Sequence, residues 1–216
     1  MPVTRAVLAL LAAAFLSALW LGPLPALARE SFAAHMTMHM SVVAVAAPIL
    51  ALAIAGAACD PIRRASAPGL PLLASIIELI VVWGWHAPAM HHAARQALWA
   101  LTLEQASFLV AGAALWLAAF GGDREQRRLR AGSGVAALLF TSMHMTLLGA
   151  LFALANRPLF HHASATDANA LADQHLGGAV MLIVGGASYL AGGLWLAGRM
   201  MRNSRAGVLV REESMP

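Results

Sequence analysis

The sequence predicts an all-α protein, a polytopic membrane helix bundle, from three observations. Hydrophobic residues make up 60% of the 216 residues and charged residues only 11%, whereas a soluble domain carries roughly a quarter charged residues. The apolar residues gather in stretches as long as a helix that crosses a bilayer. All 14 basic residues are arginine, and they are dense in alternate connectors only, which is typical of a membrane topology.

Residues 1–28 have the features of a secretory signal peptide. Arg5 precedes a short apolar run, and the segment closes with Ala26-Leu27-Ala28, an A-x-A ending. Because the run is short for a span, which needs about 20 residues, we expect cleavage after Ala28. The alternative is an uncleaved sixth helix that forms the first transmembrane helix of the chain.

Five apolar stretches follow, each long enough to cross a hydrocarbon core of about 30 Å at about 1.5 Å per residue. Backbone groups in lipid must be hydrogen-bonded within the protein, so each stretch should be a helix. We expect these five mature transmembrane helices within a bundle at residues 29–200, with a cytoplasmic tail at 201–216. The stretches are 36–58, 70–89, 97–120, 133–155 and 176–198.

Arginine placement predicts the orientation. Because basic residues accumulate in cytoplasmic segments, the protein should lie in a bacterial inner membrane with its mature N-terminus periplasmic and its C-terminus cytoplasmic. The pI of about 10.9 then reflects topology rather than nucleic acid binding. The eleven arginines of the cytoplasmic set are Arg5, Arg63, Arg64, Arg124, Arg127, Arg128, Arg130, Arg199, Arg202, Arg205 and Arg211, and the outer set is Arg29, Arg95 and Arg157.

The nine histidines avoid every segment assigned to the cytoplasm. His144 lies near the middle of a span, where a polar residue is costly and indicates function. The other eight lie at outer helix ends or in outer loops, and we interpret four of them, His91, His92, His161 and His162, as interfacial side chains with a polar tip in water. The remaining four are His35, His39, His86 and His175.

The densest cluster is His35-Met36-Thr37-Met38-His39-Met40. At 3.6 residues per turn, His35 and His39 share one helix face, with Met38 beside them and Met36 and Met40 on an adjacent stripe. Thioether sulfur suits Cu(I), and imidazole binds copper in either oxidation state. The pattern predicts a copper site, with Cu(I) as the expected form. The alternative is that the methionines are packing residues.

Several further polar residues could belong to this site. His86 and His175 lie at the outer ends of neighbouring helices, and His144 is flanked by Met143 and Met145. Asp173 could cap the last helix or reach a bound metal. Glu78 and Glu104 lie within spans, where each could orient a histidine, belong to a proton path, or pair with an arginine or a hydroxyl.

Several stretches resemble the CtaG family of membrane proteins, named for the assembly of caa3-type cytochrome c oxidase. They occur in the order of that family and run from about residue 33 to 200. They are His35-Met36 through His39-Met40 with Ala47-Pro48, Trp85-His86-Ala87-Pro88-Ala89, Ser107-Phe108-Leu109 leading to Trp116, Leu148-Gly149-Ala150-Leu151 through Pro158-Leu159-Phe160, and Asp173-Gln174-His175-Leu176-Gly177-Gly178 with Met181.

The resemblance implies an integral membrane protein needed to produce active oxidase, by delivering or inserting copper. It carries the histidine motifs of the family onto His35, His39 and His86, and its Asp-Gln motif onto Asp173 and Gln174. The chain departs from the family in two ways. Gln105 stands where the family often has histidine, and the chain has five mature spans where many members have more.

Our leading hypothesis is therefore a non-enzymatic copper-binding assembly factor. Its expected partners are a cytochrome c oxidase subunit, a periplasmic copper donor and membrane lipid. A haem-binding electron carrier is one alternative, because paired histidines between helices can ligate haem. His144 opposite His86 or His39 would be the candidate pair. A copper permease and a purely structural scaffold are two others. We expect no catalysis, since the sequence has no Ser/His/Asp set and no phosphate-binding loop.

Overall fold

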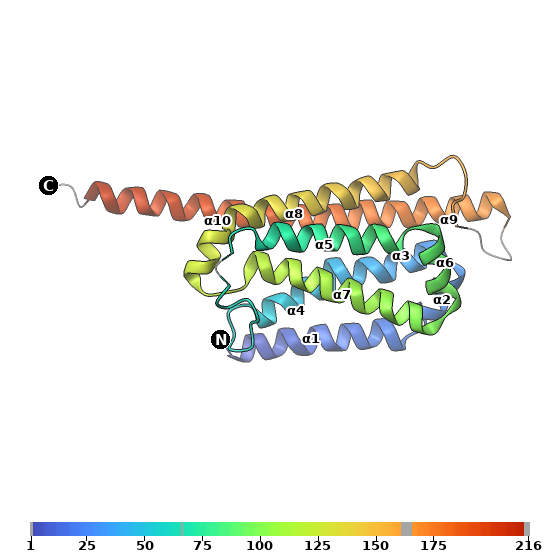
Figure 1. The fold of residues 1–216 in the computed structure, drawn as a ribbon, viewed down its shortest axis with the longest axis horizontal. Helices are drawn as coiled ribbons and strands as arrows, with labels where there is room; N and C mark the ends of the chain where they lie inside the picture. The colour runs from blue at the N-terminus through green and yellow to red at the C-terminus, as the bar shows by residue number, and fades with distance from the viewer. Residues whose placement is uncertain (1, 66, 161–165, 214–216) are drawn as a thin grey trace.

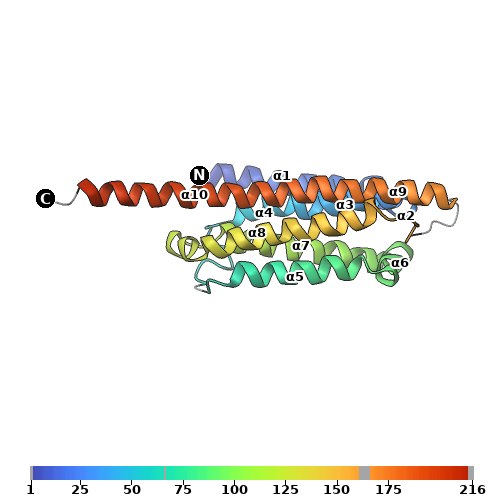
Figure 2. The same cartoon turned by 90° about the horizontal axis from the view of Figure 1, so that it is seen from above.

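The computed structural model describes residues 2–65, 67–160 and 166–213, and every regular element in these ranges is helical. The helices run side by side along one long axis (Figure 1). A view turned by 90° shows α1 and α5 on opposite sides of the bundle (Figure 2). The helices are α1 Pro2–Leu21, α2 Leu24–Glu30, α3 Phe32–Met40, α4 Ala47–Ile54, α5 Leu70–Trp85, α6 Pro88–Gln96, α7 Leu98–Phe120, α8 Arg124–Ala153, α9 Asp167–Val180 and α10 Gly186–Glu213.

Five helical segments in the described residues are long and apolar enough to cross a membrane. A sixth span results if α5 and α6, which meet at a bend of 72°, are counted together. The prediction of a polytopic all-helical bundle is confirmed. The five segments are Val3–Leu21, Phe32–Ile54, Leu98–Phe120, Arg124–Ala153 and Asp167–Arg202.

The stretch expected at 70–89 ends earlier than the sequence suggested. Helix α5 stops at Trp85, and α6 starts afresh at Pro88. The residue before a proline is driven out of the α region, and Ala87 is accordingly extended, with φ −62° and ψ 135°. The outer turn expected around His91 is therefore a separate helix that folds back over the end of the bundle.

The N-terminal segment forms a helix that lies along α4. Its Ala12, Leu16 and Leu19 side chains are buried, and the Arg5 guanidinium donates a hydrogen bond of 2.9 Å to the carbonyl of Ala55. Cleavage after Ala28 stays a prediction, as does the alternative of a retained first span.

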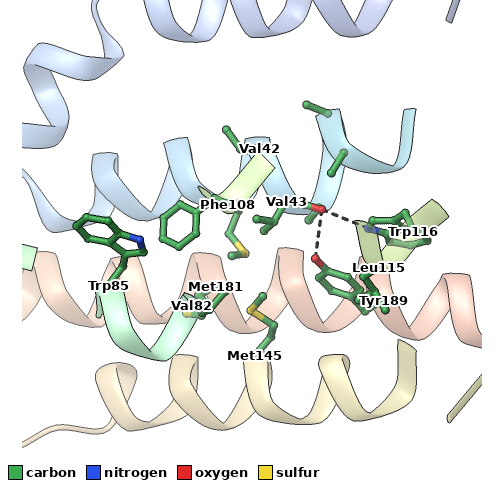
Figure 3. Packing of buried hydrophobic residues seen from close by; sticks show 14 of the residues in the cluster. Val42, Val43, Val82, Trp85, Phe108, Leu115, Trp116, Met145, Met181 and Tyr189 are labelled. Atoms are coloured by element: carbon green, nitrogen blue, oxygen red, sulfur yellow. Dashed lines mark hydrogen bonds between the residues drawn. The ribbon is translucent and has the colours of Figure 1, made fainter. Parts of the chain in front are cut away.

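Two short π-helical turns, Ser41–Ala46 and Met181–Gly185, interrupt the long spans. A π-helical turn disturbs the regular backbone ladder and is frequent at functional sites. Here the Val43 carbonyl accepts a hydrogen bond of 3.3 Å from Trp116 Nε1 and lies 3.2 Å from the Tyr189 hydroxyl (Figure 3). The first π-turn thus joins three spans by hydrogen bonds in the middle of the bundle.

Most of the arginines lie at one end of the bundle, which we call the arginine end, whereas Arg29 on α2 and Arg95 on α6 lie at the other end. Arg127 donates to the carbonyl of Gly122, and Arg130 donates to those of Ala65 and Gly121. The opposite end, which we call the histidine end, carries α2, α6 and the start of α9 (Figure 1).

Candidate functional site

Four buried histidines meet at the histidine end, and we call them the histidine cluster. His35 and His39 come from α3, His86 follows the last residue of α5, and His91 lies on α6. Their exposed fractions are 1%, 0%, 4% and 1%. Ring centroids are 4.6 Å apart for His35 and His91, 5.1 Å for His39 and His86, and 6.3 Å for His35 and His86.

The local sequence explains these positions. His35 and His39 are one turn apart on α3, whose start is capped by Ser31 Oγ accepting from the Ala34 amide. The bend at Pro88 turns α6 inward, so that His91 and Ala94, three residues apart, face the bundle.

His86 is held in one tautomer. Its Nδ1 lies 2.6 Å from the Val82 carbonyl oxygen, and because a carbonyl only accepts, Nδ1 must carry the proton. In the neutral ring Nε2 is then unprotonated, and it lies 3.4 Å from the Met36 sulfur. A backbone hydrogen bond of this kind fixes the ring and leaves the other nitrogen free to ligate a metal.

His39 has no hydrogen-bond partner at either ring nitrogen, although it is fully buried. Its ring packs on Phe108, with centroids 4.0 Å apart. Buried polar groups are nearly always hydrogen-bonded, so an exception needs a reason. A nitrogen that is reserved for a bound cation is one such reason.

Glu104 joins the cluster from α7. Its Oε1 lies 3.3 Å from Nε2 of His35, and both side chains are buried. The distance is short enough for an ion pair, but the two atoms do not form a hydrogen bond, and neither has another hydrogen-bond partner. Gln105 donates to the other carboxylate oxygen, Oε2, at 3.2 Å. Gln105 therefore contacts the same carboxylate that lies beside His35.

Glu78 lies away from the cluster, in the middle of the bundle. Its Oε1 is 2.5 Å from the Tyr189 hydroxyl, whose one proton can be donated either to Glu78 or to the Val43 carbonyl. Nearby on the same helix, Ser75 is hydrogen-bonded to Thr141 at 2.7 Å. Glu78 is thus the partner of a tyrosine, whereas Glu104 is the partner of a histidine.

Asp173 caps a helix, but α3 rather than the last helix. Its Oδ1 accepts from Ser31 Oγ at 2.7 Å and from the Ala33 amide at 3.3 Å, and its Oδ2 accepts from the Phe32 amide at 2.5 Å. The carboxylate therefore satisfies amides at the start of α3, one turn before His35, and the negative charge there is favourable for the helix dipole.

Four other candidates point elsewhere. The sulfur of Met40 faces the backbone at Gly185, and Met38 lines a groove with Trp20 and Gln105. His144 is in ring contact with Phe140. Nε2 of His175 lies 2.8 Å from the Ala155 carbonyl. None of these four makes a ring or hydrogen-bond contact with the histidine cluster among the contacts that the structure records for described residues.

Sequence reasoning missed the place of His91, and it left three roles open for Glu104, of which contact with a histidine is the one that the structure shows. The signal for His91 was Pro88, which starts a new helix with His91 and Ala94 on one face. Of the other residues interpreted as interfacial, His92 is exposed, and His161 and His162 lie outside the described residues. Within the described ranges, no three His, Cys, Asp or Glu side chains form a ready-made metal-binding set.

Taken together, the long apolar helices and the polar cluster buried beneath one end define a polytopic membrane protein with an internal site. The chain belongs to the cytochrome c oxidase caa3 assembly factor family (Caa3_CtaG), whose sequence model matches residues 1–203. The match confirms the resemblance and includes the N-terminal helix. Comparisons with curated proteins and with solved structures gave no match.

Proposed function

We propose that this assembly factor binds copper, as Cu(I), in the histidine cluster and helps to deliver it to the oxidase. The observation that carries the proposal is the pair formed by His86 Nε2 and the Met36 sulfur, 3.4 Å apart. Two ligands of one tetrahedral metal, with bonds of about 2.0–2.3 Å, lie roughly 3.3–3.8 Å apart. Imidazole and thioether are also the ligand types that suit Cu(I).

His39 supplies the third ligand in this proposal. Its ring is 5.1 Å from that of His86, and both of its nitrogens lack a partner. In the part of the chain that the structure describes, no three His, Cys, Asp or Glu side chains are placed to bind one metal ion, so binding requires the thioether of Met36 and small ring rotations. Such a site exchanges its metal more easily than a closed thiolate cage, as delivery requires. Glu104 would orient His35 beside it.

The same geometry disfavours a haem held between His39 and His86. Axial histidines must lie on opposite faces of the macrocycle, but the rings of His39 and His86 already pack against each other and against Phe108. No space for a porphyrin separates them.

Metal analysis and an absorption spectrum of the detergent-purified protein test the proposal. We expect about one copper per chain after exposure to Cu(I), and no Soret band. A Soret band would make the histidines haem ligands and overturn the copper proposal. Protein that holds neither metal nor haem would favour a structural scaffold instead.

We also propose that the histidine end faces the periplasm, where a copper donor could reach it, and that the arginine end faces the cytoplasm. The exposed Cys59 is the one cysteine of the chain and lies at the arginine end, just after α4. A membrane-impermeant maleimide should therefore label inverted vesicles and spare intact spheroplasts. Labelling of spheroplasts alone would reverse the orientation, and a Cys59→Ser variant provides the background.

A further inference from the structure

A pocket at the arginine end is lined by guanidinium groups and is not part of the copper site. Its volume is about 290 Å³, and it lies between the end of α7, the start of α8 and α10. Four of its lining residues are arginines, and the other five are apolar or small. The arginines are Arg124, Arg127, Arg128 and Arg199.

Among the described residues, no carboxylate lines this pocket. Two acidic residues flank Arg124 in the sequence: Asp123 pairs with Arg63 at 3.0 Å, and Glu125 is exposed and outside the pocket lining. Asp60, which is buried, accepts from the amides of Gly56 and Gly122. Four like charges around one hollow repel one another unless an anion lies between them. The charge balance of the pocket therefore calls for an anionic ligand.

An apolar groove continues from this pocket. It has a volume of about 300 Å³ and is lined by Pro48, Leu52, Trp116, Phe120, Gly192 and Trp195. Phe120 lines both hollows, and its ring packs on Trp195 with centroids 5.2 Å apart. The Trp195 ring in turn lies 4.7 Å from the guanidinium carbon of Arg199. A cationic pocket and an apolar groove thus share one wall.

The position along the bundle is that of a membrane boundary. The apolar span of α7 ends at Phe120, and α8 begins at Arg124. We propose that the arginine pocket binds the phosphate headgroup of an anionic phospholipid, with one acyl chain in the adjoining groove. Arginine binds phosphate oxygens in a bidentate manner, and basic pockets between transmembrane helices suit such headgroups. A soluble phosphate would use the arginines but not the groove.

Lipid binding to the purified full-length protein in phosphatidylcholine nanodiscs tests this proposal, with phosphatidylglycerol as the probe and inorganic phosphate as competitor. The pocket variant is Arg124→Gln/Arg128→Gln/Arg199→Gln. The control is Arg63→Gln/Arg64→Gln/Arg202→Gln, which removes the same charge outside the pocket lining. We expect the pocket variant to bind phosphatidylglycerol at least about tenfold more weakly than the control, because only the pocket variant removes guanidinium groups that can contact the bound phosphate.

A second variant leaves every arginine in place. Leu52→Trp fills the groove from its half-exposed rim, so it should weaken phosphatidylglycerol binding and leave phosphate binding unchanged. Equal affinity in the pocket and control variants would overturn the proposal. Displacement of the lipid by inorganic phosphate at matched concentration, with no effect of Leu52→Trp, would also overturn it, since the ligand would then be a soluble anion.

Discussion

Replacing His35 and His39 together by alanine is expected to abolish copper binding to the purified protein. The change removes His39, a buried histidine whose two ring nitrogens have no hydrogen-bond partner, and His35, the histidine that contacts Glu104. Because loss of even an outer partner of a ligand lowers metal affinity by about 10–100-fold, loss of a direct ligand should lower it by more. Copper per chain, measured after dialysis, gives the result, and oxidase activity in cells should fall with it.

A matched double variant controls for the loss of two histidines. His92 is exposed and His144 is buried beside Phe140, and neither has a ring contact with the histidine cluster. His92→Ala/His144→Ala should therefore keep its copper. Met36→Leu nearly preserves the side-chain volume and removes the sulfur beside His86, so it should weaken binding without affecting the fold. Normal copper content in His35→Ala/His39→Ala would refute the site, as would equal loss in both double variants.

Gly178→Val should destabilise the bundle by about 3 kcal/mol or more, the upper part of the range for overpacking. A Cβ at Gly178 would overlap the backbone nitrogen of Ala153 and lie 2.7 Å from the Gly149 carbonyl oxygen. Both are backbone atoms of α8, so they cannot move out of the way by a change of rotamer. The backbones of α8 and α9 therefore touch at Gly149 and Gly178, as small residues permit between membrane helices.

The free energy of unfolding in mixed detergent and SDS measures this effect. Gly84→Ala is the control, because a Cβ at Gly84 meets no atom within 4 Å, and alanine favours a helix by roughly 0.5–1 kcal/mol. A Gly178→Val protein as stable as the control would contradict the packing. Since α9 also carries Asp173, which caps α3, the glycine variant should in addition reduce copper binding through the displaced His35.

Composition and local spacing determined a large part of this protein. The scarcity of charge predicts lipid as the solvent, and lipid leaves helices as the structure for long apolar stretches. Helical periodicity alone places His35 and His39 on one face. Those inferences depend on the spacing of residues a few positions apart or on the mean composition of a span, and both can be read directly from the sequence.

Tertiary structure alone decided which polar residues meet. Nothing near Asp173 in the sequence indicates that it caps a helix about 140 residues away. The sequence also does not give the angle of the bend at Pro88, and that angle decides whether His91 lies near the other histidines. Met38 and Met40 share a helix with His39, yet they face different neighbours. The sequence by itself therefore determined the class of fold and one face of the site. The rest depended on how the helices pack against one another, which follows from contacts such as Gly149 against Gly178 that no local pattern encodes.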